Sequence, residues 1–228
     1  MLEFTTEDGT SGFVRQVSIR RVCIRRIWSA SALLLFMLVS PGAILADEFA
    51  PVEVGISGDL PNITVETTSG DVLIERNQDQ DNVISGEFAR TSRPCPPFCI
   101  QPHEVAAGVT TIGELELLDM LQDPDVIVID SRELEWYLEG TIPGSTHLSY
   151  TEVAERLDEL GCKRVAGQWN CDESREVALF CNGPWCGQSP AGIRAMLREG
   201  YPAERIAYYR GGMQTWQMLG LTVVEGDF

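Results

Sequence analysis

The chain has 228 residues, of which 44% are hydrophobic and 22% are charged, and its formal net charge is −17. This length and apolar content suffice for one packed domain with an additional segment, and they exclude a globally disordered chain. Five of the 17 basic residues and three of the 34 acidic residues precede residue 47, so residues 47–228 carry a net charge of −19. Such an acidic body repels phosphate backbones, and we therefore predict no nucleic-acid partner.

Residues 1–46 have the pattern of a secretory signal peptide. Arginines at 20–26 precede an apolar run at 27–39, a Ser-Pro-Gly break follows, and Ala46 offers a small residue before Asp47. The apolar run is shorter than the roughly 20 residues of a transmembrane helix, although an uncleaved anchor is the alternative. We expect export, to a bacterial periplasm, and no stable membrane insertion after cleavage.

Six cysteines follow the predicted signal peptide, and an even number in an oxidising compartment indicates disulfide bonds. Sequence alone cannot choose among the pairings, but the cysteines form three local couples. We expect structural bridges in the first two couples and leave the third open: Cys95 with Cys99, Cys162 with Cys171, and Cys181 with Cys186. These spacings differ from the usual zinc-binding couples and the chain has only two histidines, so we predict no metal site and no cofactor.

Residues 47–110 read as a small β-rich extension. Residues 62–67 alternate like a strand, a Ser-Gly-Asp turn follows, 72–74 give a second strand, and 82–88 suggest a third. So small a meander depends on a neighbouring domain for its stability. A proline-rich link at 93–99 carries Cys95 and Cys99.

From residue 111 the pattern changes to strands that alternate with helices. This order predicts an α/β fold for residues 111–228: a doubly wound parallel sheet with helices on both faces. The continuous apolar runs 126–130 and 176–180 are typical of buried parallel strands. The remaining expected elements are helices at 114–121, 153–160, 188–198 and 215–219, and a strand at 205–209.

Cys181 directly follows the buried strand 176–180, and a helix is expected from residue 188. Ligands of parallel sheets bind at the carboxyl ends of the strands. We expect Ser189 to cap this helix with Pro190 in its first turn, and the glycines to let backbone N–H groups converge on the thiol. Convergent N–H groups lower a thiol pKa, so Cys181 is the candidate nucleophile. The predicted active-site loop comprises Asn182, Gly183, Pro184, Trp185, Cys186, Gly187, Gln188 and Ser189. A buried core cysteine, or an inert disulfide with Cys186, is the alternative.

Three blocks of residues 111–228 resemble the rhodanese (sulfurtransferase) superfamily. Asp130-Ser131-Arg132 followed by Gly140–Ser145 is similar to D-x-R…G-H-I-P-G-A, and strand, Cys181, loop and helix form the second block. The third block, 211–223, is similar to G-G-x-x-x-W-x-x-x-G-L-P-V. The resemblance implies a persulfide on Cys181, a small sulfur donor and a thiol or other thiophilic acceptor. We expect Asp130 and Arg132 to form a supporting ion pair beneath the site.

The loop departs from this family in carrying no Arg or Lys between residues 181 and 190. With an acidic body around it, thiosulfate is not the expected donor, and Trp185 indicates a more apolar or thiol-bearing one. Two other functions stay open. One is a periplasmic thiol–disulfide redox protein that uses Cys181 and Cys186. The other is a catalytically silent binding module with the same fold.

Overall fold

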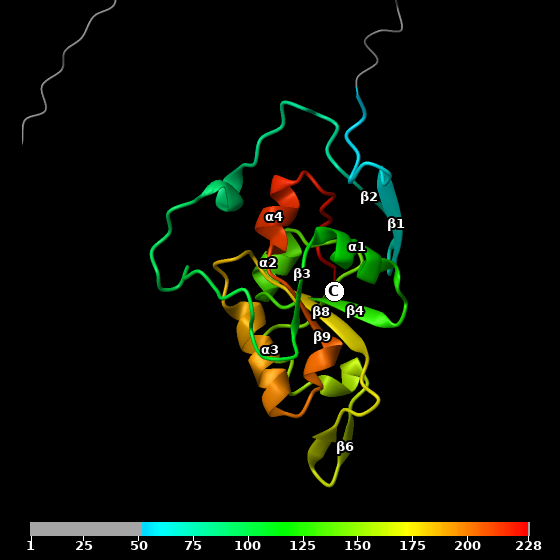
Figure 1. Ribbon diagram of the computed structural model, residues 1–228, viewed down its shortest axis with the longest axis vertical. Coiled ribbons are helices and arrows are strands. Elements are labelled where there is room, and N and C mark those ends of the chain that lie inside the picture. Colours follow the sequence, from blue (N-terminus) through cyan, green and yellow to red (C-terminus); the bar gives the residue numbers. More distant parts are fainter. Residues whose placement is uncertain (1–51, 228) are drawn as a thin grey trace, which may run out of the picture. The chain divides into compact units, whose positions relative to one another are not determined.

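The computed structural model describes residues 52–227 (Figure 1). The predicted signal peptide lies outside the described residues. Within 52–227, no helix is long and apolar enough to cross a membrane. The same part of the chain holds no group of three or more His, Cys, Asp or Glu side chains arranged to bind a metal ion.

A five-stranded parallel sheet forms the centre of the molecule. Its strand order is β3-β9-β8-β4-β5, and every neighbouring pair is parallel. The strands are β3 (Thr110–Ile112), β9 (Ile206–Tyr209), β8 (Glu176–Phe180), β4 (Val126–Asp130) and β5 (Thr146–His147). The predicted α/β fold is confirmed, and β4 and β8 have the predicted bounds because both are continuous apolar runs. The short edge strands β3 and β5 were not predicted.

Helices cover both faces of the sheet (Figure 1). Side chains of β8 alternate between the two faces: Val177 and Leu179 join one apolar core, whereas Ala178 and Phe180 join the other. The first core includes Ile193 from α3, and the second contains residues of α1 and α4. The helices are α1 (Glu114–Gln122), α2 (Leu134–Glu139), α3 (Gln188–Arg198) and α4 (Gly212–Met218).

The helix expected at 153–160 is wrong. This segment consists of turns followed by the 3₁₀ helix η2 (Leu157–Leu160), which ends at Gly161 in the left-handed conformation. Its apolar residues are buried, but over so few residues their spacing cannot separate an α-helix from turns. A further 3₁₀ helix, η3 (Ala203–Arg205), precedes β9.

An unpredicted hairpin follows η2. Strands β6 (Lys163–Val165) and β7 (Gln168–Asn170) pair antiparallel, and both residues of their connecting turn, Ala166 and Gly167, have positive φ. Two consecutive positive φ values are the signature of a tight hairpin turn. The alanine gave no turn signal in the sequence because it rarely adopts this conformation.

The extension is a two-stranded hairpin rather than a three-stranded meander. Strands β1 (Asn62–Thr67) and β2 (Gly70–Glu75) pair antiparallel, and their inward side chains share a core with α1 and α4. The third strand expected at 82–88 is wrong, and η1 (Gly86–Ala89) lies there instead. Residues 220–222 continue the pairing after β2: Asn77 N donates to Gly220 O and Thr222 N to Glu75 O. The described residues lie within one compact unit, and the boundary at residue 110 stays a prediction.

Candidate active site

Cys181 lies at the carboxyl end of β8, the central strand of the sheet. Its exposed fraction is 2%, yet it belongs to neither apolar core. Its sulfur atom lies 3.4 Å from the carbonyl oxygen of Cys186, across the loop. Cys181 is therefore a covered residue that faces the loop, not a residue that fills the core.

Backbone hydrogen bonds from the start of α4 fix the position of the first two residues of the loop. Met213 N donates to Cys181 O at 3.0 Å, and Gln214 N donates to Asn182 O at 3.0 Å. Gly212 has a φ of +56°, and a Cβ atom there would lie 2.3 Å from Cys181 O. Only glycine permits this close approach, so Gly212 allows the start of α4 to pack directly against the backbone of the loop.

The environment of Cys181 favours its thiolate. Burial raises the pKa of Cys181, but hydrogen bonds from Cys186, from the side chain and backbone of Ser189, and from the backbone of Gly183 outweigh it and lower the pKa from 9.0 to about 7. The hydrogen bond to Cys181, together with burial, raises the pKa of Cys186. Of the pair, Cys181 therefore ionises first and Cys186 stays a thiol, whose Sγ also lies 3.6 Å from Gln188 Oε1.

Ser189 contacts the site differently from the prediction. The helix α3 begins at Gln188 with Gly187 in the capping position, so Ser189 is not the N-cap. Its fully buried hydroxyl lies 2.7 Å from the hydroxyl of Ser131, which also lies 2.7 Å from Phe180 O. Because Ser131 donates its own hydroxyl hydrogen to Phe180 O, the single hydroxyl hydrogen of Ser189 has two acceptors, Ser131 Oγ and Cys181. The amide of Ser189 lies in the first turn of α3 and also donates to Cys181.

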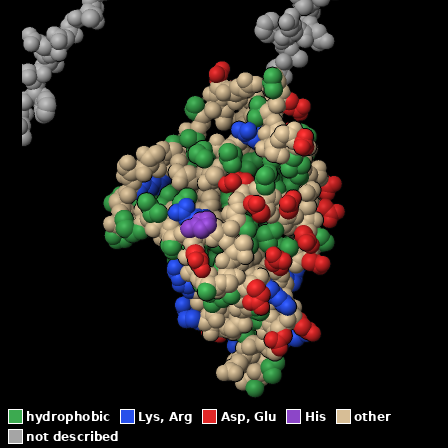
Figure 2. All heavy atoms as spheres, viewed as in Figure 1, with side chains coloured by type: hydrophobic (Ala, Val, Ile, Leu, Met, Phe, Trp, Pro, Cys, Tyr) green, Lys and Arg blue, Asp and Glu red, His purple; other side chains and the backbone are tan. Residues whose placement is uncertain are grey.

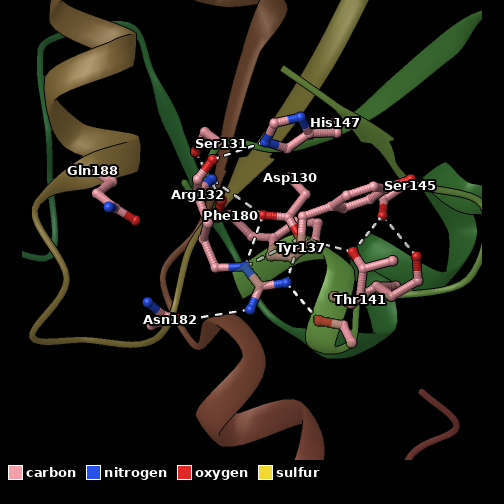
Figure 3. Close-up of polar contacts among 12 residues, drawn as sticks. Asp130, Ser131, Arg132, Tyr137, Thr141, Ser145, His147, Phe180, Asn182 and Gln188 are labelled. Atoms are coloured by element: carbon pink, nitrogen blue, oxygen red, sulfur yellow. Dashed lines mark hydrogen bonds and ion pairs between the residues drawn. The ribbon is translucent and has the colours of Figure 1, made fainter. Parts of the chain in front are cut away.

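Asp130 and Arg132 form a fully buried ion pair beneath the loop (Figure 3). Arg132 Nε donates to Asp130 Oδ1 at 2.8 Å, and Arg132 Nη1 donates to Asn182 Oδ1 at 3.2 Å. Arg132 also donates to Gly140 O, and Thr141 Oγ1 donates to Asp130 Oδ2. The ion pair therefore links the end of β4, the end of α2 and the active-site loop.

A segment that was not predicted to belong to the site covers the loop: residues 93–101, here called the covering segment. The ring of Phe98 packs edge-on against Trp185 with centroids 4.9 Å apart, and Gln101 N donates to Pro184 O at 2.8 Å. Trp185 Nε1 donates to Gln214 Oε1 at 2.6 Å. The sequence showed a proline-rich link here but held no sign of which surface it covers.

The structure places the six cysteines in distinct surroundings. The sulfur atoms of Cys95 and Cys99, in the covering segment, lie at bonding distance, as do those of Cys162 and Cys171, which flank the β6–β7 hairpin. Cys181 and Cys186 are free thiols. Both of these thiols are buried within the loop.

Residues 114–219 match the family model described as the rhodanese-like domain. This part of the chain belongs to the rhodanese superfamily. The match contains the strands β4, β5, β8 and β9 of the central sheet, Cys181 and its loop. The strand β3, the hairpin β1–β2 and the covering segment precede it.

The chain is similar to several known proteins over about half of its length. It is 30% identical over 115 residues to an HTH-type transcriptional regulator of Mycobacterium tuberculosis (50% of this chain, 45% of that protein). It is 26% identical over 125 residues to arsenate reductase 2.2 of Oryza sativa subsp. japonica, a match that covers 52% of this chain and 90% of that protein.

Two solved structures are similar. A rhodanese-related protein from Thermoplasma volcanium has 23% identity and a TM-score of 0.38, over 50% of this chain and 97% of that one. The thiosulfate sulfurtransferase from Pseudomonas aeruginosa has 21% identity and a TM-score of 0.40, over 52% of this chain and 21% of that one. The chain spans less than half of the length of the Mycobacterium protein.

Replacing Cys186 with Ala is expected to raise the pKa of Cys181 above about 7. The change removes a hydrogen-bond donor that favours the thiolate, which is worth about one pH unit or more. The ultraviolet absorbance of the thiolate, titrated against pH, measures this. Cys186→Ser keeps a donor at the position and should shift the midpoint less. A midpoint that stays in place or moves to lower pH would contradict the assignment of Cys186 as donor.

Proposed function

We propose that this domain is a sulfurtransferase that forms a persulfide on Cys181 and passes the sulfane sulfur to a thiol or other thiophilic acceptor. The observation that carries this proposal is the position of Cys181 at the carboxyl end of the central strand, with its sulfur atom facing the loop 3.4 Å from Cys186 O. Hydrogen bonds from the loop and from Ser189, which lower the pKa of Cys181, support it. A thiolate that is populated at neutral pH is a competent nucleophile.

The reaction has two balanced steps. In loading, the Cys181 thiolate attacks the outer sulfur of the donor, a new S–S bond forms, and the donor's own bond to that sulfur breaks. The leaving group departs with the electron pair. In release, the acceptor attacks the outer sulfur of the persulfide, and Cys181 returns as a thiolate. The groups that stabilise the thiolate, Gly183 N–H and Ser189 among them, suit the persulfide anion for the same reason.

Intact mass spectrometry of the reduced mature protein tests this proposal directly. The protein is exposed separately to thiosulfate, mercaptopyruvate and a polysulfide. Gain of one sulfur atom at Cys181 is the expected result with at least one of these donors. No mass change with any of them would contradict sulfur transfer and would favour a catalytically silent module.

A thiol–disulfide redox role is the second candidate, since the thiol of Cys186 is a hydrogen-bond partner of Cys181. When the thiol of Cys186 attacks the Cys181 sulfur of a persulfide, hydrogen sulfide leaves; when it attacks a sulfenic acid that a peroxide has formed on Cys181, water leaves. Either reaction joins the two residues in a disulfide. In the same mass measurement, loss of two hydrogen atoms without gain of sulfur identifies this reaction.

Export to a bacterial periplasm, with cleavage near residue 46, belongs to the same proposal. An oxidising compartment suits the two cysteine pairs whose sulfur atoms lie at bonding distance, Cys95 with Cys99 and Cys162 with Cys171. The N-terminal sequence of the exported protein and its thiol content before reduction check both points. A mature chain that begins at residue 1, or one with six titratable thiols, would contradict them.

A further inference from the structure

The structure brings arginine side chains to the active-site loop from outside it. The loop itself carries no Arg or Lys between residues 181 and 190. Arg93 reaches it from the covering segment, and Arg210 directly follows β9, the neighbour of β8 in the sheet. Neither arginine is part of the sequence block that contains Cys181.

Arg93 is stacked between two aromatic rings at the loop. Its guanidinium carbon lies 4.9 Å from the ring centre of Trp185 and 4.6 Å from that of Phe98. Its side chain is 5% exposed, and its Nη2 lies 3.1 Å from a carboxylate oxygen of Glu87 and also donates to Glu87 O. Its Nε is buried without a hydrogen-bond partner. The guanidinium therefore lies at the loop with a donor unused.

Arg210 is tied to the same loop through the covering segment. Its Nη2 donates to Gln101 O at 2.9 Å, and Gln101 N in turn donates to Pro184 O. The Nε of Arg210 is also buried without a partner. Buried donors are nearly always satisfied in folded proteins, so each exception asks for an explanation.

Such exceptions are few among the described residues, and two of them belong to the arginines at the loop. Within residues 52–227, three buried side-chain polar atoms have no partner: Arg93 Nε, Arg210 Nε and Tyr208 Oη. Burial raises the pKa of Tyr208, and the charges of Cys181 and Arg210 act on this pKa in opposite directions, so Tyr208 lies within electrostatic reach of both. Arg93 Nε and Arg210 Nε are hydrogen-bond donors, so a ligand group that satisfies either of them would be an acceptor.

The surface charge agrees with this arrangement. Figure 2 shows Lys and Arg side chains gathered along the side that carries the covering segment and α3, whereas Asp and Glu gather on the side of β1, β2 and α1. Basic side chains are therefore concentrated on this side of a chain whose net charge is −17, although Glu87 offsets part of the charge of Arg93.

We propose that Arg93 and Arg210 recognise the negatively charged end of the sulfur donor and so determine donor specificity. This inference rests on the proposed function, and it departs from the expectation of a more apolar or thiol-bearing donor. With thiosulfate as the example, Cys181 attacks the outer sulfur, the S–S bond of thiosulfate breaks, and sulfite leaves with the electron pair. The two guanidinium groups offset the charge of the donor and of the departing sulfite.

Two alkylating reagents that differ only in charge test this recognition at Cys181 itself. Iodoacetate is an anion and iodoacetamide is neutral, and with both the thiolate attacks the same carbon and iodide leaves. The ratio of their rates at Cys181, located by mass spectrometry at neutral pH, cancels differences in thiolate content and access. Arg93→Gln and Arg210→Gln should each lower the iodoacetate-to-iodoacetamide ratio about 10-fold, the effect expected of one charge-assisted contact. Sulfur loading from thiosulfate should fall by a similar factor.

The chain offers a matched control in Arg164. Its guanidinium carbon lies 4.0 Å from the ring centre of Trp169, so Arg164→Gln removes an equal charge and a similar stack. It lies on the β6–β7 hairpin, far from the covering segment (Figure 1), and should leave the ratio unchanged. Arg93→Lys should retain part of the ratio because it keeps the charge.

The outcomes separate this inference from the proposed function. An unchanged ratio in both Gln variants, or a fall equal to that in Arg164→Gln, would overturn the role of Arg93 and Arg210. If the ratio falls as expected but the wild-type protein gains no sulfur from any donor, anion recognition stands and sulfur transfer fails.

Discussion

Replacing Cys181 with Ser is expected to abolish sulfur loading, with a loss on the order of 10³-fold or more. A serine hydroxyl at this position would meet the same amides and the same neighbours, but it is not ionised near neutral pH and it forms no persulfide. The two side chains are similar in size, so the fold should persist. Intact mass after exposure to a donor measures the loss, and circular dichroism checks the fold.

Cys186→Ser is the matched control, since it removes the other free thiol of the same loop. This variant should still load sulfur at Cys181 but should differ in the release or reversibility of the step. Sulfur gain that persists in Cys181→Ser and disappears in Cys186→Ser would show that the two roles are exchanged.

Replacing Asp130 with Asn is expected to destabilise the protein by about 3–5 kcal/mol, because breaking a buried ion pair leaves the other charge unpaired. Arg132 has an exposed fraction of 1% and its Nε and Nη2 both donate to Asp130, so the asparagine would leave a buried guanidinium without its counter-charge. Denaturation in urea, compared with the wild type, measures the change in the free energy of unfolding.

Glu152→Gln provides the control for this carboxylate-to-amide change. Glu152 pairs with Arg156 at 2.9 Å, but both side chains are about half exposed, so the cost should lie below about 1 kcal/mol. A cost for Asp130→Asn as small as that of the control would contradict a supporting role for the buried pair. Replacement of both Asp130 and Arg132 by apolar residues should recover part of the stability, since no buried charge then remains unpaired.

Much of the central sheet could be predicted from local patterns. The strands β4 and β8 and the helix α3 have the predicted bounds, because continuous apolar runs and a helix bounded by glycines give strong local signals. The elements that were missed or wrong are short. The edge strands β3 and β5 and the helix α2 have too few residues for a periodic pattern. Where a third strand was expected to follow β2, residues 220–222 pair with the chain at the end of β2 instead.

The candidate site could be predicted in part. The loop after Cys181 was visible because a strand, glycines and a helix follow one another in the sequence. Ser189 lies in the first turn instead of at the cap, and its hydroxyl contacts Ser131, 58 residues away in the sequence. Arg93 and Phe98 reach Trp185 from a segment about 90 residues earlier. No local pattern encodes such a contact, since it arises only when the chain folds.

The β1–β2 hairpin has a consequence for any attempt to isolate the family domain. Ile63, Val65 and Ile74 are almost fully buried in the core that also contains α1 and α4. A shortened chain that starts at the family match, near residue 114, would present this face of the core to water, together with the surface of the loop that the covering segment now shields. Such a fragment should be prone to self-association because it exposes a large apolar surface. The hairpin is therefore an integral part of the folded domain and not a separable extension.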